Sequence, residues 1–227
     1  MAHKFFKAVK NLKRKIQSLT QTPLERRHSM VGHAKLWKLK RDFQIQFLLQ
    51  AGLQPHHQFF EIGYGTLRGG IPIIQYLNEG HYAGTEIRMQ VYEEAKNELE
   101  EAELLHKKRA LIVEPDIKKI KLNKKFDYIW AFSVLMHMKN DILSDCFSFV
   151  YNNLSDEGFF YANVSTSGKP QGEWQGFPVM HHSLNFYNEC CLKAGLKCES
   201  IGTLKELGHF TSLSKHDNQV MLKIRKA

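Results

Sequence analysis

The sequence Glu61-Ile-Gly-Tyr-Gly-Thr-Leu-Arg-Gly-Gly70 decides the fold, and it begins inside a short apolar run at residues 58–62. Apolar runs of this length that end in glycines are typical of buried strands. Gly63 and Gly65 permit a tight turn and a close approach of the backbone to a ligand. A helix predicted to begin near Gly69 would point its free N–H groups at that ligand. We therefore expect the end of a nucleotide-binding strand here.

The chain on either side of this stretch alternates between helical and strand patterns. Helices are predicted over residues 34–51, 69–77, 89–106, 140–153 and 184–194, and strands over residues 58–62, 82–86, 110–113, 126–132, 158–164, 197–202 and 219–224. Strands separated by helices are typical of βαβ units with helices on both faces of a parallel sheet. The predicted fold class is therefore α/β, doubly wound around a mostly parallel, seven-stranded sheet.

Acidic residues stand at the ends of the first three predicted strands. Glu61 precedes the glycines, Glu86 ends the second strand, and Asp116 follows the third. Each acid taken alone is typical of a solvated loop. In an open α/β sheet, however, ligands bind beyond the carboxyl ends of the strands, where these three acids would meet. Glu86 is suited to accept hydrogen bonds from a ribose diol and Asp116 from an adenine amino group, so together they predict a nucleoside site.

This pattern resembles the class I (Rossmann-like) S-adenosylmethionine-dependent methyltransferases over roughly residues 33–227. The resemblance rests on the acid-x-Gly-x-Gly loop, the acids after strands two and three, the segment at residues 126–138, and a last helix followed by two strands. It implies an antiparallel C-terminal hairpin and S-adenosyl-L-methionine as cofactor. The sequence departs from the family in two ways: Glu61 replaces the commoner aspartate, and Leu67 stands where a third glycine is frequent.

The resemblance also implies which residues bind the cofactor. Glu61 is expected near its amino group, the two glycines near its methionine part, and Phe132 with Ser133 on the methyl-donor side. The predicted cofactor-binding residues are Glu61, Gly63, Tyr64, Gly65, Thr66, Arg68, Glu86, Ile87, Asp116, Ile117, Phe132 and Ser133. A nicotinamide dinucleotide domain is the main competitor with the same fold. It expects a third glycine at position 68, where this sequence has Arg68.

Histidine is the candidate for catalysis. A neutral hydroxyl acceptor needs a general base, whereas an amine needs only to be unprotonated. His137 ranks first, ahead of His181, His182 and His209, because it follows the fourth strand, where the acceptor should lie. The alternative is that His137 only packs its loop. The segment at residues 168–183, with Trp174, Phe177 and Pro178, either walls the acceptor pocket or is a plain surface connection.

Charge is spread unevenly along the chain. The net charge is +9, but residues 1–42 carry twelve Lys/Arg and two Asp/Glu, whereas residues 43–227 carry twenty and twenty-one. We predict a basic amphipathic helical arm at residues 1–33, with its helix at 4–19, and a methyltransferase domain at residues 34–227. Three roles remain open for the arm: contact with an anionic membrane surface, contact with nucleic acid, or packing on the body or a partner subunit.

The resulting functional prediction is O-methylation of a small molecule, sugar or glycoconjugate. The near-neutral body argues against extended nucleic-acid contacts there. Two alternatives are an RNA or protein methyltransferase that docks through the basic arm, and a non-catalytic adenosylmethionine-binding regulatory or scaffold protein. The four cysteines show no C-x-x-C spacing, so no metal site is predicted. With no long apolar run or signal core, a cytoplasmic location is expected, with or without peripheral membrane attachment.

Overall fold

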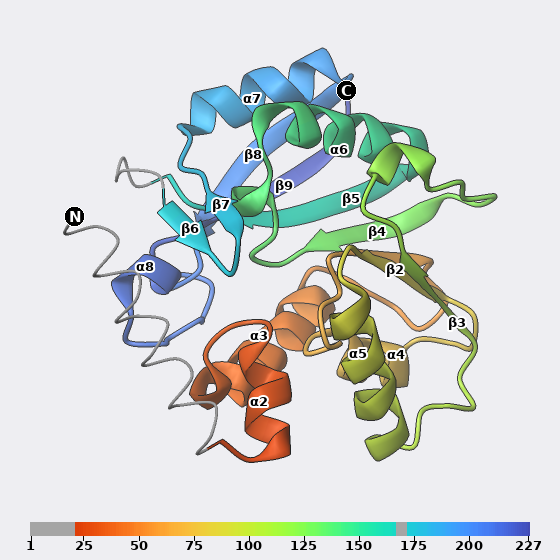
Figure 1. Ribbon diagram of the computed structural model, residues 1–227. Helices are drawn as coiled ribbons and strands as arrows, with labels where there is room; N and C mark the ends of the chain where they lie inside the picture. The colour runs from red at the N-terminus through yellow and green to blue at the C-terminus, as the bar shows by residue number, and fades with distance from the viewer. Residues whose placement is uncertain (1–20, 167–171) are drawn as a thin grey trace.

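The computed structural model describes residues 21–166 and 172–227, so the predicted helix at residues 4–19 lies outside the described residues. The described part of the chain forms a seven-stranded sheet in the order β3-β2-β1-β4-β5-β9-β8 (Figure 1). Its strands are β1 (Phe59–Ile62), β2 (Tyr82–Glu86), β3 (Arg109–Val113), β4 (Phe126–Ala131), β5 (Leu154–Val164), β8 (Leu196–Thr203) and β9 (Val220–Lys226). The helices are α2 (Pro23–Ser29), α3 (Trp37–Gln50), α4 (Gly70–Tyr76), α5 (Met89–Glu101), α6 (Asn140–Asn153), α7 (Leu184–Lys193) and α8 (Ser214–Asp217), with short 3-10 turns η1 (Ala34–Leu36), η2 (Ile117–Lys119) and η3 (Leu135–His137).

The strand order confirms the predicted doubly wound fold. β1 pairs in parallel with both β2 and β4, and the chain moves outward from β1 in one direction and from β4 in the other. A ligand crevice is expected where the direction switches, beyond the carboxyl ends of these two strands. β9 runs antiparallel between β5 and β8, which confirms the C-terminal hairpin implied by the family resemblance.

Helices cover both faces of the sheet. Figure 1 shows α6 and α7 on one face and α3, α4 and α5 on the other. Phe59 and Phe60 are both fully buried, and as strand neighbours they pack into different hydrophobic clusters on the two faces. A strand that is buried on both sides needs consecutive apolar residues rather than an alternating pattern, and this is why the run at residues 58–62 could be recognised.

A short hairpin was not predicted. β6 (Gly172–Trp174) and β7 (Phe177–Val179) pair antiparallel within the segment at residues 168–183. The turn between them has positive φ at both Gln175 (50°) and Gly176 (88°), as the common two-residue turns of β-hairpins require. Strands of three residues carry too little alternation for a period to be recognised.

The described end of the predicted arm is fixed to the domain. Thr22 caps α2, because its Oγ1 accepts a hydrogen bond from Glu25 N at 3.1 Å. From the next turn of α2, the buried Arg27 reaches acidic residues of α5. Its Nε lies 2.9 Å from Glu94 Oε2 and its Nη1 lies 2.7 Å from Glu101 Oε2. Residues 21–33 are therefore held against α5, next to the carboxyl end of the sheet.

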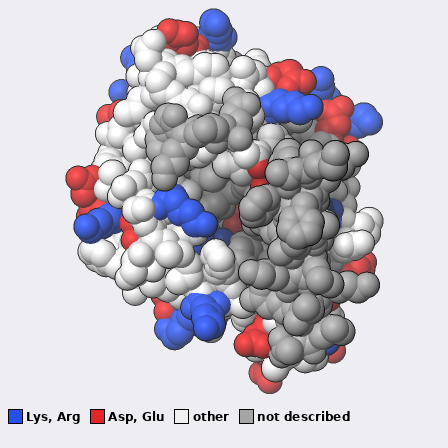
Figure 2. All heavy atoms as spheres, turned by 60° about the vertical axis from the view of Figure 1, so that its left-hand side comes forward, with Lys and Arg blue, Asp and Glu red and all other residues white. Residues whose placement is uncertain are grey.

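The visible surface carries charges of both signs. In the described part of the face drawn in Figure 2, Lys and Arg side chains alternate with Asp and Glu and do not gather into one basic surface. Among residues 21–166 and 172–227, no helix combines the length and the apolar character that a bilayer span requires.

Replacing Arg27 with Met should destabilise the fold by about 2 kcal/mol, because the acidic side chains of α5 would lose their partner. Part of this charge interaction is screened, since Glu94 and Glu101 are partly exposed. Urea unfolding followed by circular dichroism measures the difference. Arg26→Met, at the exposed neighbouring position, is the control and should change stability by less than about 0.5 kcal/mol. Equal stability of the two variants would contradict the assigned role of Arg27.

Candidate functional site

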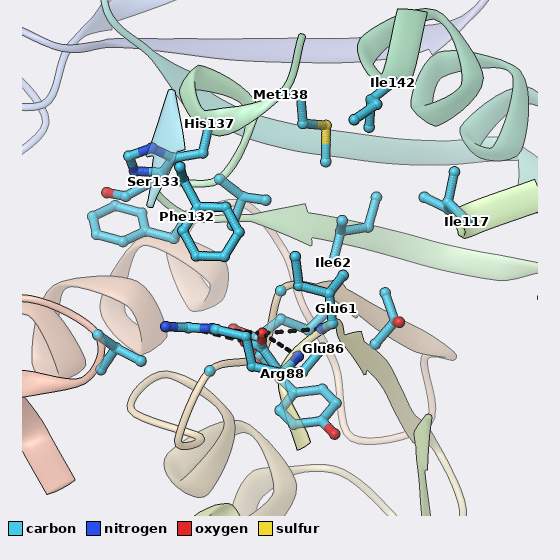
Figure 3. Close-up of a pocket in the computed structure, with 18 of the residues that line it drawn as sticks. Glu61, Ile62, Glu86, Arg88, Ile117, Phe132, Ser133, His137, Met138 and Ile142 are labelled. Atoms are coloured by element: carbon cyan, nitrogen blue, oxygen red, sulfur yellow. Dashed lines mark hydrogen bonds and ion pairs between the residues drawn. The ribbon is translucent and has the colours of Figure 1, made fainter. Parts of the chain in front are cut away.

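A cavity of about 270 Å³ lies at the carboxyl ends of β1, β2 and β4, where the direction of the sheet switches (Figure 3). This volume is near the lower end of the ~300–1,000 Å³ typical of small-molecule sites. Most of the residues predicted to form the site line it: Glu61, Gly63, Tyr64, Gly65, Arg68, Glu86, Ile87, Ile117, Phe132, Ser133 and the candidate base His137. The fold therefore brings most of the predicted site residues together around one cavity.

The loop after β1 needs its glycines. Gly63 and Gly65 have φ of 72° and 59°, and a Cβ on either would lie 2.8 Å from a valine side-chain carbon. Leu67, which stands where the family frequently has glycine, also has a positive φ of 60° and is fully buried. A left-handed conformation costs a non-glycine residue on the order of 1–3 kcal/mol. The turn therefore keeps the conformation that glycine favours, at a cost in strain.

Two opposite charges are buried at this end of the cavity. Glu61 is 3% exposed, and the Tyr82 hydroxyl donates to its Oε2 at 2.6 Å. Burial raises the pKa of Glu61 to about 8, although Tyr82 and Arg68 oppose the shift. Arg68 donates from Nη1 to Val31 O at 3.0 Å, while its buried Nε has no hydrogen-bond partner in the described structure. This pair is suited to a ligand that carries both an ammonium and a carboxylate.

Glu86 ends β2 as predicted, but its carboxylate is shared with an arginine that sequence analysis missed. Glu86 Oε1 accepts from Ile87 N at 3.0 Å and from Arg88 Nε at 3.0 Å. Arg88 Nη1 also donates to Met30 O at 3.1 Å and to Gln175 Oε1 at 3.3 Å. One guanidinium thus joins the end of β2, the residue after α2 and the turn of the β6–β7 hairpin.

The acid after β3 differs from the prediction. Glu114 lines the cavity and Asp116 does not. Asp116 Oδ1 instead accepts from Lys118 N at 3.1 Å and so caps the short helix η2. Thr66 does not line the cavity either, and its side chain is fully buried. The sequence shows two acids on this loop, and only the local turn decides which of them faces the ligand.

The other end of the cavity is apolar. Four apolar side chains lie around it: Ile62 from β1, Ile117 from η2, Met138 from the segment between η3 and α6, and Ile142 from α6 (Figure 3). Apolar side chains that face one another across a cavity are suited to a planar ring. Glu61, Glu86 and Arg88 lie together on the other side of the cavity from Met138 and Ile142 (Figure 3).

His137 lines the cavity and is held in one orientation. Its Nδ1 lies 2.8 Å from Pro178 O, and its ring is 5.2 Å from the ring of Trp174. Because a carbonyl can only accept, Nδ1 carries the proton of the neutral ring and Nε2 keeps a lone pair. Burial lowers the pKa of His137, which favours the neutral form, although the bond to Pro178 opposes the shift.

The other candidate bases lie outside the cavity wall. His181 Nδ1 is 2.8 Å from Ser165 Oγ, and His182 stacks on Phe186 with ring centroids 3.9 Å apart. His209 is 1% exposed and packs behind Phe132. Of the four histidines considered, only His137 lines the cavity.

Several residues of the wall carry no local signal in the sequence. The residues outside the predicted site that line the cavity are Val31, Gln44, Ile62, Gly69, Thr85, Arg88, Glu114, Pro115, Val134, Met138, Lys139, Ile142, Trp174, Phe177 and Pro178. The last three belong to the described part of the segment at residues 168–183, which therefore forms part of the cavity wall. Within the described ranges, no group of three or more His, Cys, Asp or Glu side chains could hold a metal ion.

Comparisons with known proteins agree with this geometry. Residues 60–160 match a family described as "Methyltransferase domain". An S-adenosylmethionine-dependent methyltransferase from Clostridium acetobutylicum ATCC 824 is similar in structure, with a TM-score of 0.64 and 13% identity over 84% of this chain and 92% of that chain. Magnesium protoporphyrin IX methyltransferase from Synechocystis PCC 6803, solved with bound S-adenosylmethionine, is also similar. Its TM-score is 0.65 at 13% identity, over 96% of this chain and 91% of that chain.

A glycopeptide N-methyltransferase, MtfA, gives a TM-score of 0.63 at 12% identity over 82% of this chain and 90% of that chain. At these identities the likeness concerns the fold. No curated protein sequence matches the chain. The methyltransferase match begins in β1 and ends in β5, so it includes the carboxyl ends of β1 to β4 and the following loops, which supply most of the cavity wall. The chain therefore has the fold of the class I, Rossmann-like S-adenosylmethionine-dependent methyltransferases, and its residues 60–160 match a methyltransferase domain.

Proposed function

We propose that this methyltransferase methylates a hydroxyl oxygen on a small molecule, sugar or glycoconjugate, with His137 as general base. The observation that carries the proposal is the bond between His137 Nδ1 and Pro178 O, because it leaves Nε2 as the basic atom of a histidine in the cavity wall. The fold alone does not choose the acceptor. Similar structures include both a protoporphyrin methyltransferase and a glycopeptide N-methyltransferase.

The residues present fit the cofactor of the family. Glu61 is suited to the amino group of the cofactor, and the partnerless Nε of Arg68 to its carboxylate. Glu86 is placed for the ribose hydroxyls. Thr85 adds a buried hydroxyl that lacks a partner among the described residues and lines the same cavity. These unmet polar groups support the assignment, because buried polar atoms normally have partners.

The remaining predicted groups complete the cofactor site. The apolar end with Ile117 is suited to adenine, and Phe132 with Ser133 forms the methyl-donor side. Ser133 is fixed there with a positive φ of 61°, because its N–H donates to Asn163 Oδ1 at 2.6 Å. When bound, the cofactor supplies an electrophilic methyl group on a sulfonium sulfur.

The protein's own part in the reaction is alignment and proton transfer. The cavity walls hold the acceptor oxygen in line with the methyl group and exclude water, which are the main requirements of a displacement. His137 Nε2 takes the proton of the acceptor hydroxyl as the new bond forms. Trp174 packs against the imidazole and holds it toward the acceptor.

Cofactor binding should depend on pH through Glu61. In the free protein its carboxyl is protonated below a pKa of about 8. Pairing with the cofactor's ammonium lowers that pKa, so binding releases a proton. The affinity for S-adenosylhomocysteine should therefore rise about tenfold between about pH 6.5 and pH 8. Isothermal titration calorimetry in buffers of different ionisation enthalpy measures both the affinity and the proton released.

Glu61→Gln is the variant for this experiment. It should remove the pH dependence and weaken binding by roughly ten- to a hundredfold at pH 8. The same variant should raise the thermal stability of the free protein at that pH. The pKa of Glu61 in the folded protein exceeds its ordinary value of 4.5. Its contribution to the stability of the folded protein is therefore lost as pH rises from 4.5 to about 8. A variant that retained the pH dependence would contradict the assignment of Glu61.

His137→Ala should lower turnover by about a hundredfold and change the affinity for S-adenosylhomocysteine by less than about threefold. In the wild-type protein, the midpoint of the acid limb of the kcat/KM profile should lie below the ordinary histidine pKa of 6.5, because burial lowers the pKa of His137. An acceptor panel of alcohols, sugars and amines, assayed by production of S-adenosylhomocysteine, supplies the substrate for both measurements.

His106→Ala, at an exposed position, is the matched control and should leave both quantities unchanged. Undiminished turnover of His137→Ala would remove this histidine from the mechanism. Turnover with amines alone would overturn O-methylation while leaving the cofactor site in place. RNA that co-purifies and is released by salt would favour the nucleic-acid alternative.

A further inference from the structure

A group of basic side chains, two of them buried and one partly buried, lies behind the methyl-donor side of the cavity. This basic cluster consists of Lys40 on α3, His209 on the loop before α8, and His216 on α8. Lys40 is 4% exposed and His209 is 1% exposed, which is unusual for residues of these types. None of the three lines the cavity, and the proposed reaction does not use them.

The basic cluster lacks hydrogen-bond acceptors. Both ring nitrogens of His209 and the Nε2 of His216 have no partner in the part of the chain that the structure describes. Asp217 is the neighbouring acid, but its Oδ1 already accepts from Thr211 N at 2.9 Å and from Thr211 Oγ1 at 2.6 Å. The same oxygen lies 3.5 Å from His209 Nδ1. The acid is therefore committed largely to the threonine.

The charges around Lys40 are unbalanced. Burial lowers the pKa of Lys40 to about 7; Arg68 and Lys215 add to the shift, and Asp217 opposes it. Burial also lowers the pKa of His209 to about 4 and of His216 to about 3, and Lys40 adds to both shifts. An ammonium near its pKa beside two neutral imidazoles can donate hydrogen bonds, yet the described structure supplies few acceptors for them.

The basic cluster lies next to the cavity wall. Gln44, which lines the cavity, is one turn after Lys40 on α3 and donates from Nε2 to the backbone carbonyl of Lys40 at 3.0 Å. The His209 ring meets the ring of Phe132 edge to face at 5.8 Å, and Phe132 belongs to the methyl-donor side. An acceptor molecule in contact with Phe132 is therefore separated from His209, a member of the cluster, by the width of one aromatic ring.

The basic cluster also reaches the outside. The ring of His216 is 6.0 Å from that of His33, which is exposed. Lys215, the neighbour of His216 on α8, is exposed as well. A ligand group approaching from this side would meet positive charge first and the unpartnered imidazole nitrogens next.

We propose that the basic cluster of Lys40, His209 and His216 binds an anionic group of the methyl acceptor, a carboxylate or a phosphate, so that the acceptor is an acidic molecule. The inference rests on the proposed function, because it takes Phe132 to mark the side from which the methyl group is donated. An anion supplies the acceptors that the imidazoles lack and offsets the charge of Lys40, and charge-assisted hydrogen bonds of this kind are the strong ones.

The test is an NMR titration of the full-length protein in the presence of S-adenosylhomocysteine. Inorganic phosphate and sodium acetate are added in separate series, and the imidazole C–H signals of His209 and His216, assigned with His209→Gln and His216→Gln, are followed. Both signals should shift and saturate with at least one of the two anions. The anion that saturates the signals identifies the acidic group as a phosphate or a carboxylate.

Variants of α3 give the comparison. Lys40→Met should raise the apparent dissociation constant of the anion by about tenfold or more, and Lys40→Arg, which keeps the charge, by less than about threefold. Lys38→Met is the matched control, because Lys38 is an exposed lysine of the same helix, and it should have no effect. If Lys40→Met does not fold by circular dichroism, Lys40→Gln and His216→Gln take its place in the same comparison.

The outcomes are separable from those of the proposed function. Calorimetry with S-adenosylhomocysteine on the same samples reports the cofactor site alone. Cofactor binding without a saturable shift of His209 and His216 in either series would overturn the anion site only. Equal anion affinity of the wild-type protein and Lys40→Met would overturn it too. Failure of the cofactor to bind would instead count against the proposed cofactor residues.

Discussion

The chain leaves β1 through a turn that requires positive φ at Gly63, Gly65 and Leu67, and the rest of the site depends on this turn. The turn allows the backbone to pass close to Val31 and Val134, where side chains at the two glycine positions would collide. It also sets Arg68 near Glu61, although seven positions separate them along the chain. A straighter exit from the strand would place the guanidinium outside the cavity and leave the carboxylate without an opposite charge.

This turn fixes the electrostatic character of the free protein. Burial raises the pKa of Glu61 to about 8 and lowers the pKa of Arg68 to about 10, so each charge is disfavoured where it stands. Removing charges from water is costly unless their hydrogen-bonding needs are met. A zwitterionic amino-acid group meets the needs of both at once. The folded protein therefore keeps two poorly satisfied groups whose partners arrive with the ligand, and this arrangement favours binding over the stability of the empty state.

Sequence patterns predicted the sheet, and most of the residues that they assign to the cofactor line one cavity, because both follow from short-range rules. Strands buried on two faces are continuous apolar runs, and ligand-binding acids stand at the ends of those strands. The choice between Glu114 and Asp116 depends instead on which side chain caps η2. Arg88 and the basic cluster depend on contacts between segments far apart in the chain, for which a single sequence carries no signal. The left-handed conformation of Leu67 could not be predicted either, because that conformation is usually recognised from a glycine and none stands at this position.

The position of Arg88 has a consequence for the order of events in turnover. Its guanidinium contacts Glu86, Met30 and Gln175 together, so the carboxylate placed for the ribose is also an anchor of the hairpin that walls the cavity. A ribose bound to Glu86, as proposed, would compete with Arg88 for the carboxylate. Release of the nucleoside would then be coupled to the contacts that hold the hairpin. This coupling would favour an order in which the cofactor binds before the acceptor and its demethylated product leaves last.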